Sequence, residues 1–577
     1  MKKLTGLGCL VGTMSLMACG SSPPPAPAAP PPAPPPVAQT SAHSAPAPVQ
    51  GDALTKWGEG AILFDDLGGF SRKVTTSSPE AQKYFDQGMR LLYAFNHDES
   101  TRSFVKAGLI DPGCGMCWWG ASLALGPNYN MPMMPDRAQA AWQARNLALQ
   151  NASKGTPVEQ ALINALAKRY KGPEPLEPPQ MQPFLEAYSA AMKDAAKRFP
   201  GDLDVQTMYA ESKMMLNPWK LWSADGKPAP GTEEIVATLE AVLAKDPNHP
   251  GANHYYIHAV EASPHPEKAV PSAERVATMM KGAGHLVHMP AHVYQRVGRY
   301  DDAVEANRQA IVADKSYMSK IRPLGYYGMY TAHNRLFLAY SAAMEGRKAE
   351  TLEAARNAGE SLPPEVLGMM PGLDWYLSPK YTALIRFGMW DEMLTTPAPE
   401  AKYTLLTGMW LYAHAVASAE KKKAADAEAD VAKLRKLIDG LPADIQAGTN
   451  DAKLVMTVAL RVSEASVAKA RGNAAEEIRL LTEAVAKEDT LAYDEPADWF
   501  YPVRQLLGAA LLTNGKAAQA EAVYREDLRR NPKNGWSLFG LSRALRAQKK
   551  TKEATESEQA FQKAWQRADT KPTNSAY

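Results

Sequence analysis

The sequence predicts an all-α protein, a right-handed solenoid of helical hairpins that follows a signal segment and a proline-rich tether. Three observations predict this fold class. From Pro79 onward the chain shows amphipathic helical patterns rich in Ala and Leu and little strand pattern. Short glycine-containing turns recur between these segments, as in "EGRKAE", "RGNAAE" and "TNGKAA". Units that begin at residues 250 and 284, 34 residues apart, share one pattern, and such a fixed spacing indicates a repeat protein.

The repeat frame is clearest near the two ends of the helical region. In a frame that begins at residue 81, positions 4, 8, 20, 24, 27 and 32 are Tyr84, Gly88, Ser100, Phe104, Ala107 and Pro112. In a frame that begins at 501, the matching residues are Gly508, Ala520, Tyr524 and Pro532. This pattern resembles the tetratricopeptide repeat, a helix–turn–helix unit, and the resemblance implies a stack of such units from 81 to 568.

The units differ in how well they match the frame. Clear units are expected at 81–114, 250–283, 284–317, 332–365, 458–491, 501–534 and 535–568. The stretches 120–200 and 366–450 match poorly. "NHYYIHAVEAS" and "HLVHMPAHVYQRVGRY" are also similar to segments of large bacterial tetratricopeptide proteins, many of them exported. That group has no settled activity, so the resemblance supports the fold and leaves the function open.

The N-terminal segment predicts export and a lipid anchor. Residues 1–18 carry Lys2 and Lys3 and then a short apolar run, which ends in "LMACG". This resembles the bacterial lipobox, which implies cleavage before Cys19 and its lipidation. The alternative is an ordinary secretory signal. Residues 19–52 are rich in Pro and Ala and predict a semi-rigid tether. We therefore expect a lipoprotein of the cell envelope, anchored in the outer membrane, with its body on the periplasmic or surface face.

The remaining composition limits the other possibilities. Between the tether and the repeats, 53–80 is a lead-in segment, and 569–577 is a C-terminal tail. The net charge of +2 gives no electrostatic footprint for nucleic acid. Cys114 and Cys117 would be the cysteines left besides Cys19, because maturation removes Cys9. In an exported protein they could form a local disulfide, a redox pair, half of a metal site, or remain two free thiols.

Histidines recur at fixed positions of neighbouring units, although the chain has only 11 of them. Position 5 is His254 and His288, position 9 is His258 and His292, and position 2 is His285 and His333. Glu261 takes position 12. Positions 2, 5, 9 and 12 of a helix fall within an arc of roughly 80°. The resemblance implies that this face lines the concave groove where ligands bind. Two aromatic residues, Trp119 and Tyr340, take positions 5 and 9 of other units. The predicted groove residues are therefore His254, His258, Glu261, His285, His288, His292, His333, Trp119 and Tyr340.

The histidine pattern supports either a metal site or a polar groove without metal. His254, His258 and Glu261 lie on one helix face at a spacing that suits one divalent ion, and His288 and His292 repeat the histidine pair. Zinc or copper would suit these ligands. Pro290 could place the start of its helix near Met289, which would leave His285 and His288 in a loop. The hypothesis predicts that at least three of the rings cluster, with Glu261 or Tyr340 at the edge.

Two classes of function follow. The first is a protein- or peptide-binding scaffold that uses the groove, since repeat solenoids offer long surfaces. The second is a metal-binding protein or metal-dependent hydrolase. We find no phosphate-binding loop, nucleophile elbow or H-E-x-x-H motif, so the sequence indicates no catalytic residues and favours binding over catalysis. The loop "NYNMPMM" from Asn128 to Met134 could offer thioethers to Cu(I), although Met-Pro loops more commonly fill gaps.

Overall fold

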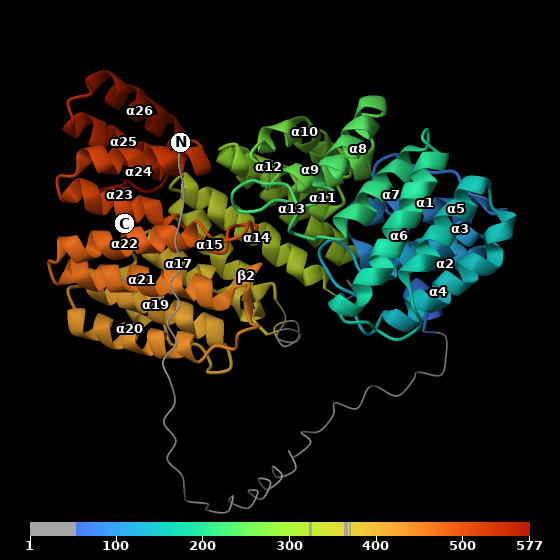
Figure 1. The fold of residues 1–577 in the computed structure, drawn as a ribbon, viewed down its shortest axis with the longest axis horizontal. Coiled ribbons are helices and arrows are strands. Elements are labelled where there is room, and N and C mark those ends of the chain that lie inside the picture. The colour runs from blue at the N-terminus through green and yellow to red at the C-terminus, as the bar shows by residue number, and fades with distance from the viewer. Residues whose placement is uncertain (1–52, 322–325, 363–366, 368–370, 577) are drawn as a thin grey trace, which may run out of the picture. The chain divides into compact units, whose positions relative to one another are not determined.

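The computed structural model describes residues 53–321, 326–362, 367 and 371–576. These residues form an all-α fold, as the sequence predicts (Figure 1). The first helices are α1 (Pro79–Tyr93), α2 (His97–Ile110), α3 (Gly115–Leu125), α4 (Ala138–Asn151), α5 (Pro157–Leu166), α6 (Pro178–Arg198), α7 (Leu203–Met214), α8 (Thr232–Lys245), α9 (Pro250–Val260), α10 (Val270–Met279), α11 (Gly284–His288), α12 (Pro290–Arg296) and α13 (Tyr300–Lys320). The predicted signal, tether and Cys19 lie outside the described residues.

The second half of the chain continues the same pattern. Its helices are α14 (Tyr327–Met344), α15 (Lys348–Glu360), α17 (Pro379–Arg386), α18 (Trp390–Thr395), α19 (Thr404–Glu420), α20 (Ala424–Asp439), α21 (Ala452–Ala470), α22 (Ala474–Glu488), α23 (Val503–Thr513), α24 (Ala517–Arg530), α25 (Gly535–Ala547) and α26 (Thr551–Ala564). Between α20 and α21, β1 (Gln446–Ala447) pairs antiparallel with β2 (Asn450–Asp451). Short 3-10 turns occur at Thr55–Gly58, Ala152–Lys154, Ala167–Arg169, Pro266–Ala269 and Leu373–Leu377. Within the described residues, no helix is long and apolar enough to cross a membrane.

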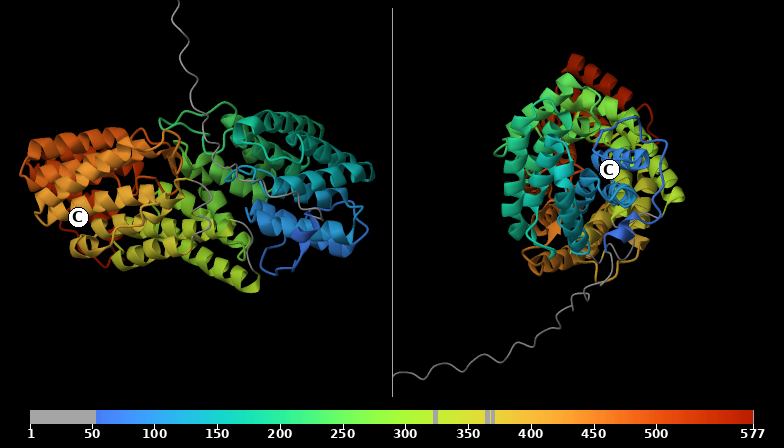
Figure 2. Two further views of the ribbon diagram at one scale, coloured as in Figure 1. Left: turned by 90° about the horizontal axis from the view of Figure 1, so that it is seen from below. Right: turned by 90° about the vertical axis from the view of Figure 1, so that its right-hand side faces the viewer.

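Consecutive helices pack as hairpins, and the hairpins stack on one another. The closest packing joins sequence neighbours such as α1 with α2, α14 with α15, α21 with α22 and α25 with α26. In Figure 1 the helices from α19 to α26 lie in rows, and Figure 2 shows the same helices from two further sides. The stretches that match the frame poorly also form hairpins, with α3 against α4, α5 against α6, and α19 against α20. Hairpins therefore also form where the repeat pattern is weak.

Glycine at position 8 allows the two helices of a unit to approach closely. A Cβ on Gly88 would lie 2.6 Å from the Phe104 ring, which takes position 24 of the same unit. In a second unit, a Cβ on Gly508 would lie 2.4 Å from the ring of Tyr524. Contacts this short exclude a side chain, so the glycine and the buried aromatic ring form one packing unit. Gly88 and Gly508 are more than 400 residues apart, so the same glycine–aromatic pairing fixes the helix packing at both ends of the repeat region.

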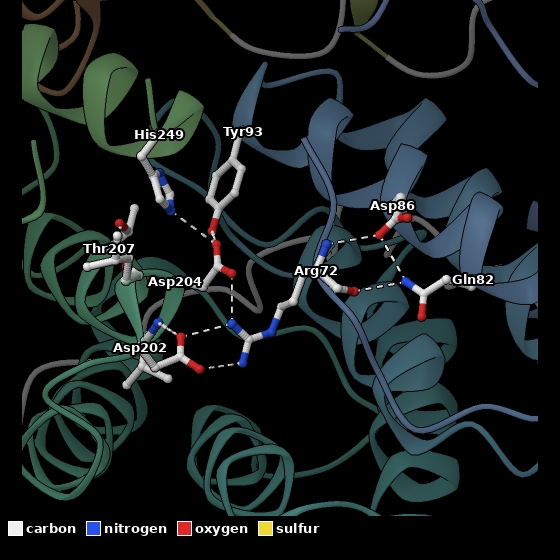
Figure 3. A network of polar contacts seen from close by, with 10 residues as sticks. Arg72, Gln82, Asp86, Tyr93, Asp202, Asp204, Thr207 and His249 are labelled. Carbon is white, nitrogen blue, oxygen red and sulfur yellow. Dashed lines mark hydrogen bonds and ion pairs between the residues drawn. The ribbon is translucent and has the colours of Figure 1, made fainter. Parts of the chain in front are cut away.

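The lead-in segment is attached to α7 and, through Asp204, to His249 at the start of α9 (Figure 3). Arg72 forms ion pairs with Asp202 at 2.8 Å and with Asp204, the second residue of α7, at 2.7 Å. Asp204 also accepts a hydrogen bond from the hydroxyl of Tyr93, at 2.5 Å, and lies 3.2 Å from Nε2 of His249. His249 caps α9, because its Nδ1 accepts from the backbone N–H of Ala252. The network therefore connects α1, α7 and the start of α9.

Pro290 divides the helix that carries three of the histidines. The chain forms α11, then Met289, then α12 with Pro290 in its first turn. Proline is tolerated there because its missing N–H would be unpaired at that position. His285 and His288 therefore lie on the short helix α11 and not in a loop. The break changes the helix locally and leaves the His288 ring beside His292, with His285 beside His288.

Candidate metal centre

Six histidine rings lie in one cluster. Along the cluster, the ring centroids of neighbours are 4.6 to 6.3 Å apart, between His254 and His258 (5.0 Å), His254 and His285 (5.1 Å), His258 and His285 (6.3 Å), His258 and His292 (5.4 Å), His285 and His288 (5.8 Å), His288 and His292 (4.6 Å), and His288 and His333 (4.8 Å). The rings come from α9, α11, α12 and α14. The structure thus brings together the histidines that the repeat frame places on one face.

The cluster is buried, which differs from the open groove that the sequence predicts. Five of the six rings are between 0% and 3% exposed, and His333 is half-buried. Segments from other parts of the chain cover this face. They include the loop that carries Asn130 and Met131, and the loop that carries Asp494 and Glu495. Repeat geometry sets the direction of the side chains, but only the long connections decide whether a groove stays open.

In the histidine pair of α9, protein acceptors hold both Nδ1 atoms. Nδ1 of His254 lies 2.5 Å from the backbone oxygen of Tyr93, and Nδ1 of His258 lies 2.7 Å from Oε1 of Glu261. A carbonyl oxygen only accepts, so a neutral His254 carries its proton on Nδ1 and has a lone pair on Nε2. Nε2 of both rings is buried and has no hydrogen-bond partner. These two donor atoms are free to bind an ion.

The second histidine pair is held at Nδ1 in the same way, but its Nε2 atoms contact each other. Nδ1 of His288 lies 2.7 Å from Oδ1 of Asn307, whose amide nitrogen donates to the backbone oxygen of Ala303. Nδ1 of His292 lies 2.7 Å from Oε2 of Glu261 and 2.8 Å from Oε2 of Glu495. The Nε2 atoms of His288 and His292 face each other at 2.7 Å. In a known metal site, a histidine ligand commonly donates its other N–H to a carboxylate or carbonyl group in this way.

Burial and the two glutamates set the charge of the rings in opposite directions. Burial lowers the pKa of His258 and His333 to about 3 and that of His254, His285 and His288 well below the usual range. Burial alone would also lower the pKa of His292. The carboxylates of Glu495 and Glu261 outweigh it and raise that pKa to about 10. Five rings are therefore neutral at pH 7, the form that binds metal, while an ion bound by His292 must displace a proton.

A cavity of about 310 Å³ adjoins the cluster. His258, His285, His292 and His333 form part of its wall. The remaining wall is mainly apolar and aromatic, with polar atoms from a few side chains; it includes Trp219, Tyr326, Tyr330, Met131, Met329, Leu336, Tyr376, Asp494 and Glu495. Such a cavity is large enough for a small molecule next to the imidazoles.

The other predicted site residues lie elsewhere. Trp119 is buried in α3 and does not line the cavity. Tyr340 points away from the cluster, with its ring on Phe500 and its hydroxyl 3.4 Å from Oδ1 of Asn531. Both occupy a groove position in the frame, but Trp119 is buried in the core and Tyr340 lines a different cavity. Cys114 and Cys117 form a disulfide at the start of α3, one of the alternatives that the sequence left open.

Several residues of the site carry no signal in the repeat pattern. Glu495 lies in the connection between α22 and α23, far from the histidines in the sequence. Phe95 and Phe337 pack on the rings, and Asn307 and the backbone of Tyr93 orient two of them. A buried acid in a turn has no periodicity that sequence reasoning could use. The run "YDEPADWF", with acidic and aromatic residues together, is the one unusual feature nearby.

The comparisons with known proteins show low similarity. No family model matches the chain, and no curated protein matches it. Among solved structures, a human IFIT1 dimer with m7Gppp-AAAA has a TM-score of 0.33 at 11% identity, over 89% of this chain and 99% of that one. Yeast Tom70 has a TM-score of 0.28 at 11% identity, over 85% and 93%. A structure of Naa15/Naa10 bound to HypK-THB has 0.23 at 14% identity, over 84% and 70%. Values this low transfer no ligand or partner to this chain.

The chain's own repeats decide the fold class. Equivalent histidines sit in units 34 residues apart, at 254 and 288 and at 258 and 292, and position 8 glycines pack on position 24 aromatic rings. The fold is a solenoid of helical hairpins, and its 34-residue spacing resembles that of the tetratricopeptide repeat. In this solenoid the histidine cluster lies where the first helices of consecutive units meet.

Proposed function

We propose that this protein binds a transition-metal ion in the buried histidine cluster. The observation that carries the proposal is the arrangement of the imidazoles: protein acceptors hold the Nδ1 atoms, while buried Nε2 atoms face one another or lack partners. Burying unpartnered polar atoms costs about 1 to 3 kcal/mol each. A bound ion would accept the lone pairs of several of these nitrogen atoms at once and would so remove this cost.

The ligand type favours an ion that prefers imidazole. Zinc and copper both bind neutral histidine nitrogen, whereas Mg²⁺ and Ca²⁺ prefer a set made of oxygen atoms. With an open coordination position, such an ion could activate a water molecule toward a substrate in the adjoining cavity. A hydrolase is therefore the enzymatic form of this proposal, and metal binding is the part on which it depends.

The test is the metal content of protein that carries no histidine tag. The chain is stripped with a chelator, loaded with Zn²⁺ or Cu²⁺, desalted, and measured by elemental analysis. We expect at least one equivalent of bound metal in the wild type and a large loss in the double variant His258→Gln, His292→Gln. Circular dichroism shows whether that variant keeps its helices.

The matched control replaces histidines outside the cluster. His265 is exposed, and His414 stacks on Trp410 in α19, so His265→Ala and His414→Ala should keep the full metal content. A wild type that retains less than a tenth of an equivalent, measured with both ions, would rule the proposal out.

A second candidate function is peptide or protein binding, which is common among repeat solenoids. A second cavity of about 640 Å³ favours it. Tyr340 lines this cavity, together with charged residues of both signs that include Arg296, Arg504, Arg529, Arg530, Glu488, Asp489 and Asp527. A peptide array probed with the purified protein should show binders whose signal falls in the variant Tyr340→Ala but not in the double variant His258→Gln, His292→Gln.

We further propose that Cys19 anchors the protein at the cell envelope. The lipobox-like sequence and the proline-rich tether support this location. Fractionation of cells that express the Cys19→Ala variant should move the protein from the membrane to soluble fractions. Unchanged membrane association of the variant would argue against a lipid anchor at this residue.

A further inference from the structure

The six histidines form two triads that take equivalent positions of consecutive repeat units. The first triad is His254, His258 and His285, and the second triad is His288, His292 and His333. Each triad takes positions 5 and 9 of one unit and position 2 of the next unit. In each triad, one potential donor atom from every histidine lies within 4.8 Å of the others. The repeat has therefore built the same local arrangement twice.

The surroundings of the two triads correspond as well. The Phe95 ring packs on the first triad, with centroid distances of 4.3, 5.7 and 5.5 Å to His254, His258 and His285. The Phe337 ring packs on the second triad in the same way, 4.7 to 4.8 Å from its three rings. An aromatic ring beside each set of imidazoles excludes water and limits the motion of the ligands.

Each triad offers nitrogen atoms that suit one ion. In the first triad, Nε2 of His254, Nε2 of His258 and both nitrogens of His285 are buried without partners. In the second triad, Nε2 of His288 and Nε2 of His292 are 2.7 Å apart. With metal–nitrogen bonds of about 2.0 Å, two ligands of a tetrahedral ion are about 3.3 Å apart. Small side-chain movements therefore suffice in both triads.

We infer that the cluster holds two metal ions side by side, one bound by each triad. This inference rests on the proposed metal-binding function and deepens it. Three histidine ligands leave a fourth position open on each ion. Members of both triads line the same cavity, His258 and His285 from the first and His292 and His333 from the second. A small molecule in that cavity would therefore lie next to both ions.

Glu261 connects the two sites as a positioning residue. Its Oε1 lies 2.7 Å from Nδ1 of His258 in the first triad, and its Oε2 lies 2.7 Å from Nδ1 of His292 in the second. Through these two contacts, one carboxylate fixes the ring orientation of a ligand in each triad. Replacing it should weaken both sites without removing a ligand from either.

A different metal site competes with this arrangement. His258, Glu261, His292 and Glu495 also offer donor atoms within 4.8 Å of one another. A single ion bound there would use the Nδ1 atoms of the two histidines and the two carboxylates directly. The two arrangements differ in which residues are ligands, because His285 and His333 belong only to the triads and Glu261 and Glu495 only to the competing site.

The experiment counts bound copper per chain in the full-length protein without a tag. The wild type, loaded with Cu²⁺ and desalted, should hold two equivalents, and X-ray absorption should show about three imidazoles per ion. His285→Ala should lower the count to one, and so should His333→Ala, while the double variant should bind none. His285→Asn and His333→Asn serve as second variants that keep a polar side chain, and circular dichroism verifies folding. His265→Ala is the control.

The outcomes separate this inference from the broader function. Two triad sites are supported if the wild type holds two equivalents and each single histidine variant holds one. In that case Glu261→Gln should still bind both ions, but more weakly. One equivalent that persists in His285→Ala and His333→Ala but disappears in Glu261→Gln would overturn the inference and assign the carboxylate site. One equivalent that either histidine variant abolishes would also overturn it, since a single ion would then use both triads. A wild type without copper would instead reject metal binding itself.

Discussion

Single side chains decide whether the imidazoles of this solenoid can act as ligands. Asn307 is one such side chain. A hydrogen bond from its amide nitrogen fixes its position, so that its amide oxygen faces His288. Nδ2 donates to the backbone oxygen of Ala303 at 2.7 Å, which leaves Oδ1 to accept from Nδ1 of His288. The amide therefore holds the proton of His288 on Nδ1 and leaves a lone pair on Nε2, the atom that faces Nε2 of His292.

Removing this acceptor should weaken metal binding although Asn307 would touch no ion. The substitution Asn307→Leu keeps the volume and removes the acceptor, so the ring of His288 is no longer held in one orientation. We expect affinity for the ion to fall about 10- to 100-fold, measured by competition with a chelating dye. Gln309→Leu, on the exposed side of the same helix, should change nothing. Equal affinity of Asn307→Leu and wild type would show that His288 needs no such support.

Asp204 should make stability depend on pH. Burial alone would raise the pKa of Asp204, but hydrogen bonding to His249 and the charge of Arg72 lower it to about 2. An unfolded aspartate has a pKa of about 3.9. The folded pKa is the lower one, so the contribution is complete above about pH 4 and is lost as the pH falls toward 2.

The variant Asp204→Asn tests this dependence. It leaves Arg72 without one buried partner and should cost roughly 3 kcal/mol at pH 7. The difference from wild type in urea midpoint should shrink between about pH 4 and pH 2, because protonated Asp204 resembles the amide. The exposed substitution Asp439→Asn should show no comparable loss. A constant difference over this pH range would exclude Asp204 as the titrating group.

At the scale of the helix pair, packing determines the repeat more than helix propensity does. Position 8 of the unit that begins at 501 is Gly508, inside α23, where alanine would intrinsically favour the helix by about 1 kcal/mol. Alanine is excluded there because its Cβ would approach the Tyr524 ring to 2.4 Å. Tyr524 is fully buried, so the ring has no free space to move into.

Gly508→Ala should therefore destabilise the protein, although helix propensity alone predicts that alanine stabilises it. We expect a loss of about 1 to 3 kcal/mol from overpacking, seen as a lower melting temperature. Gly201→Ala is the control, since nothing lies within 4 Å of its added Cβ. An unchanged or higher melting temperature in Gly508→Ala would mean that α23 and α24 can separate without cost.

At the scale of the whole molecule, the site depends on segments far apart in the sequence. The histidines come from α9, α11, α12 and α14, whereas Glu495 comes from the connection before α23. A bound ion would therefore stabilise contacts between parts of the solenoid that are more than 200 residues apart (His292 and Glu495). Ligands that bind only the folded state stabilise it by mass action.

Metal should raise the melting temperature of the entire chain. At a free ion concentration of about 100 times the Kd, one site contributes about 2.7 kcal/mol. For a chain of this length we expect a rise of roughly 2 °C, measured by calorimetry with and without Zn²⁺. The double variant His258→Gln, His292→Gln should show no rise. The same rise in that variant would place the stabilising ion elsewhere.

The sequence by itself determined the helical hairpins, the 34-residue frame and the face on which the histidines lie. These features are local: the periodicity of apolar residues places helices, and a fixed spacing turns the same side of each unit the same way. For this reason His254 and His288, which share position 5, can be paired from the repeat frame alone.

Only the tertiary structure decided what surrounds those histidines. The connection with Glu495, the loop with Met131 and the two phenylalanines Phe95 and Phe337 close the predicted groove into a buried cluster beside a cavity. Tyr340 shares a groove position yet packs against Phe500 instead. Contacts made by long connections have no period in the sequence, since they depend on where distant segments meet when the solenoid packs.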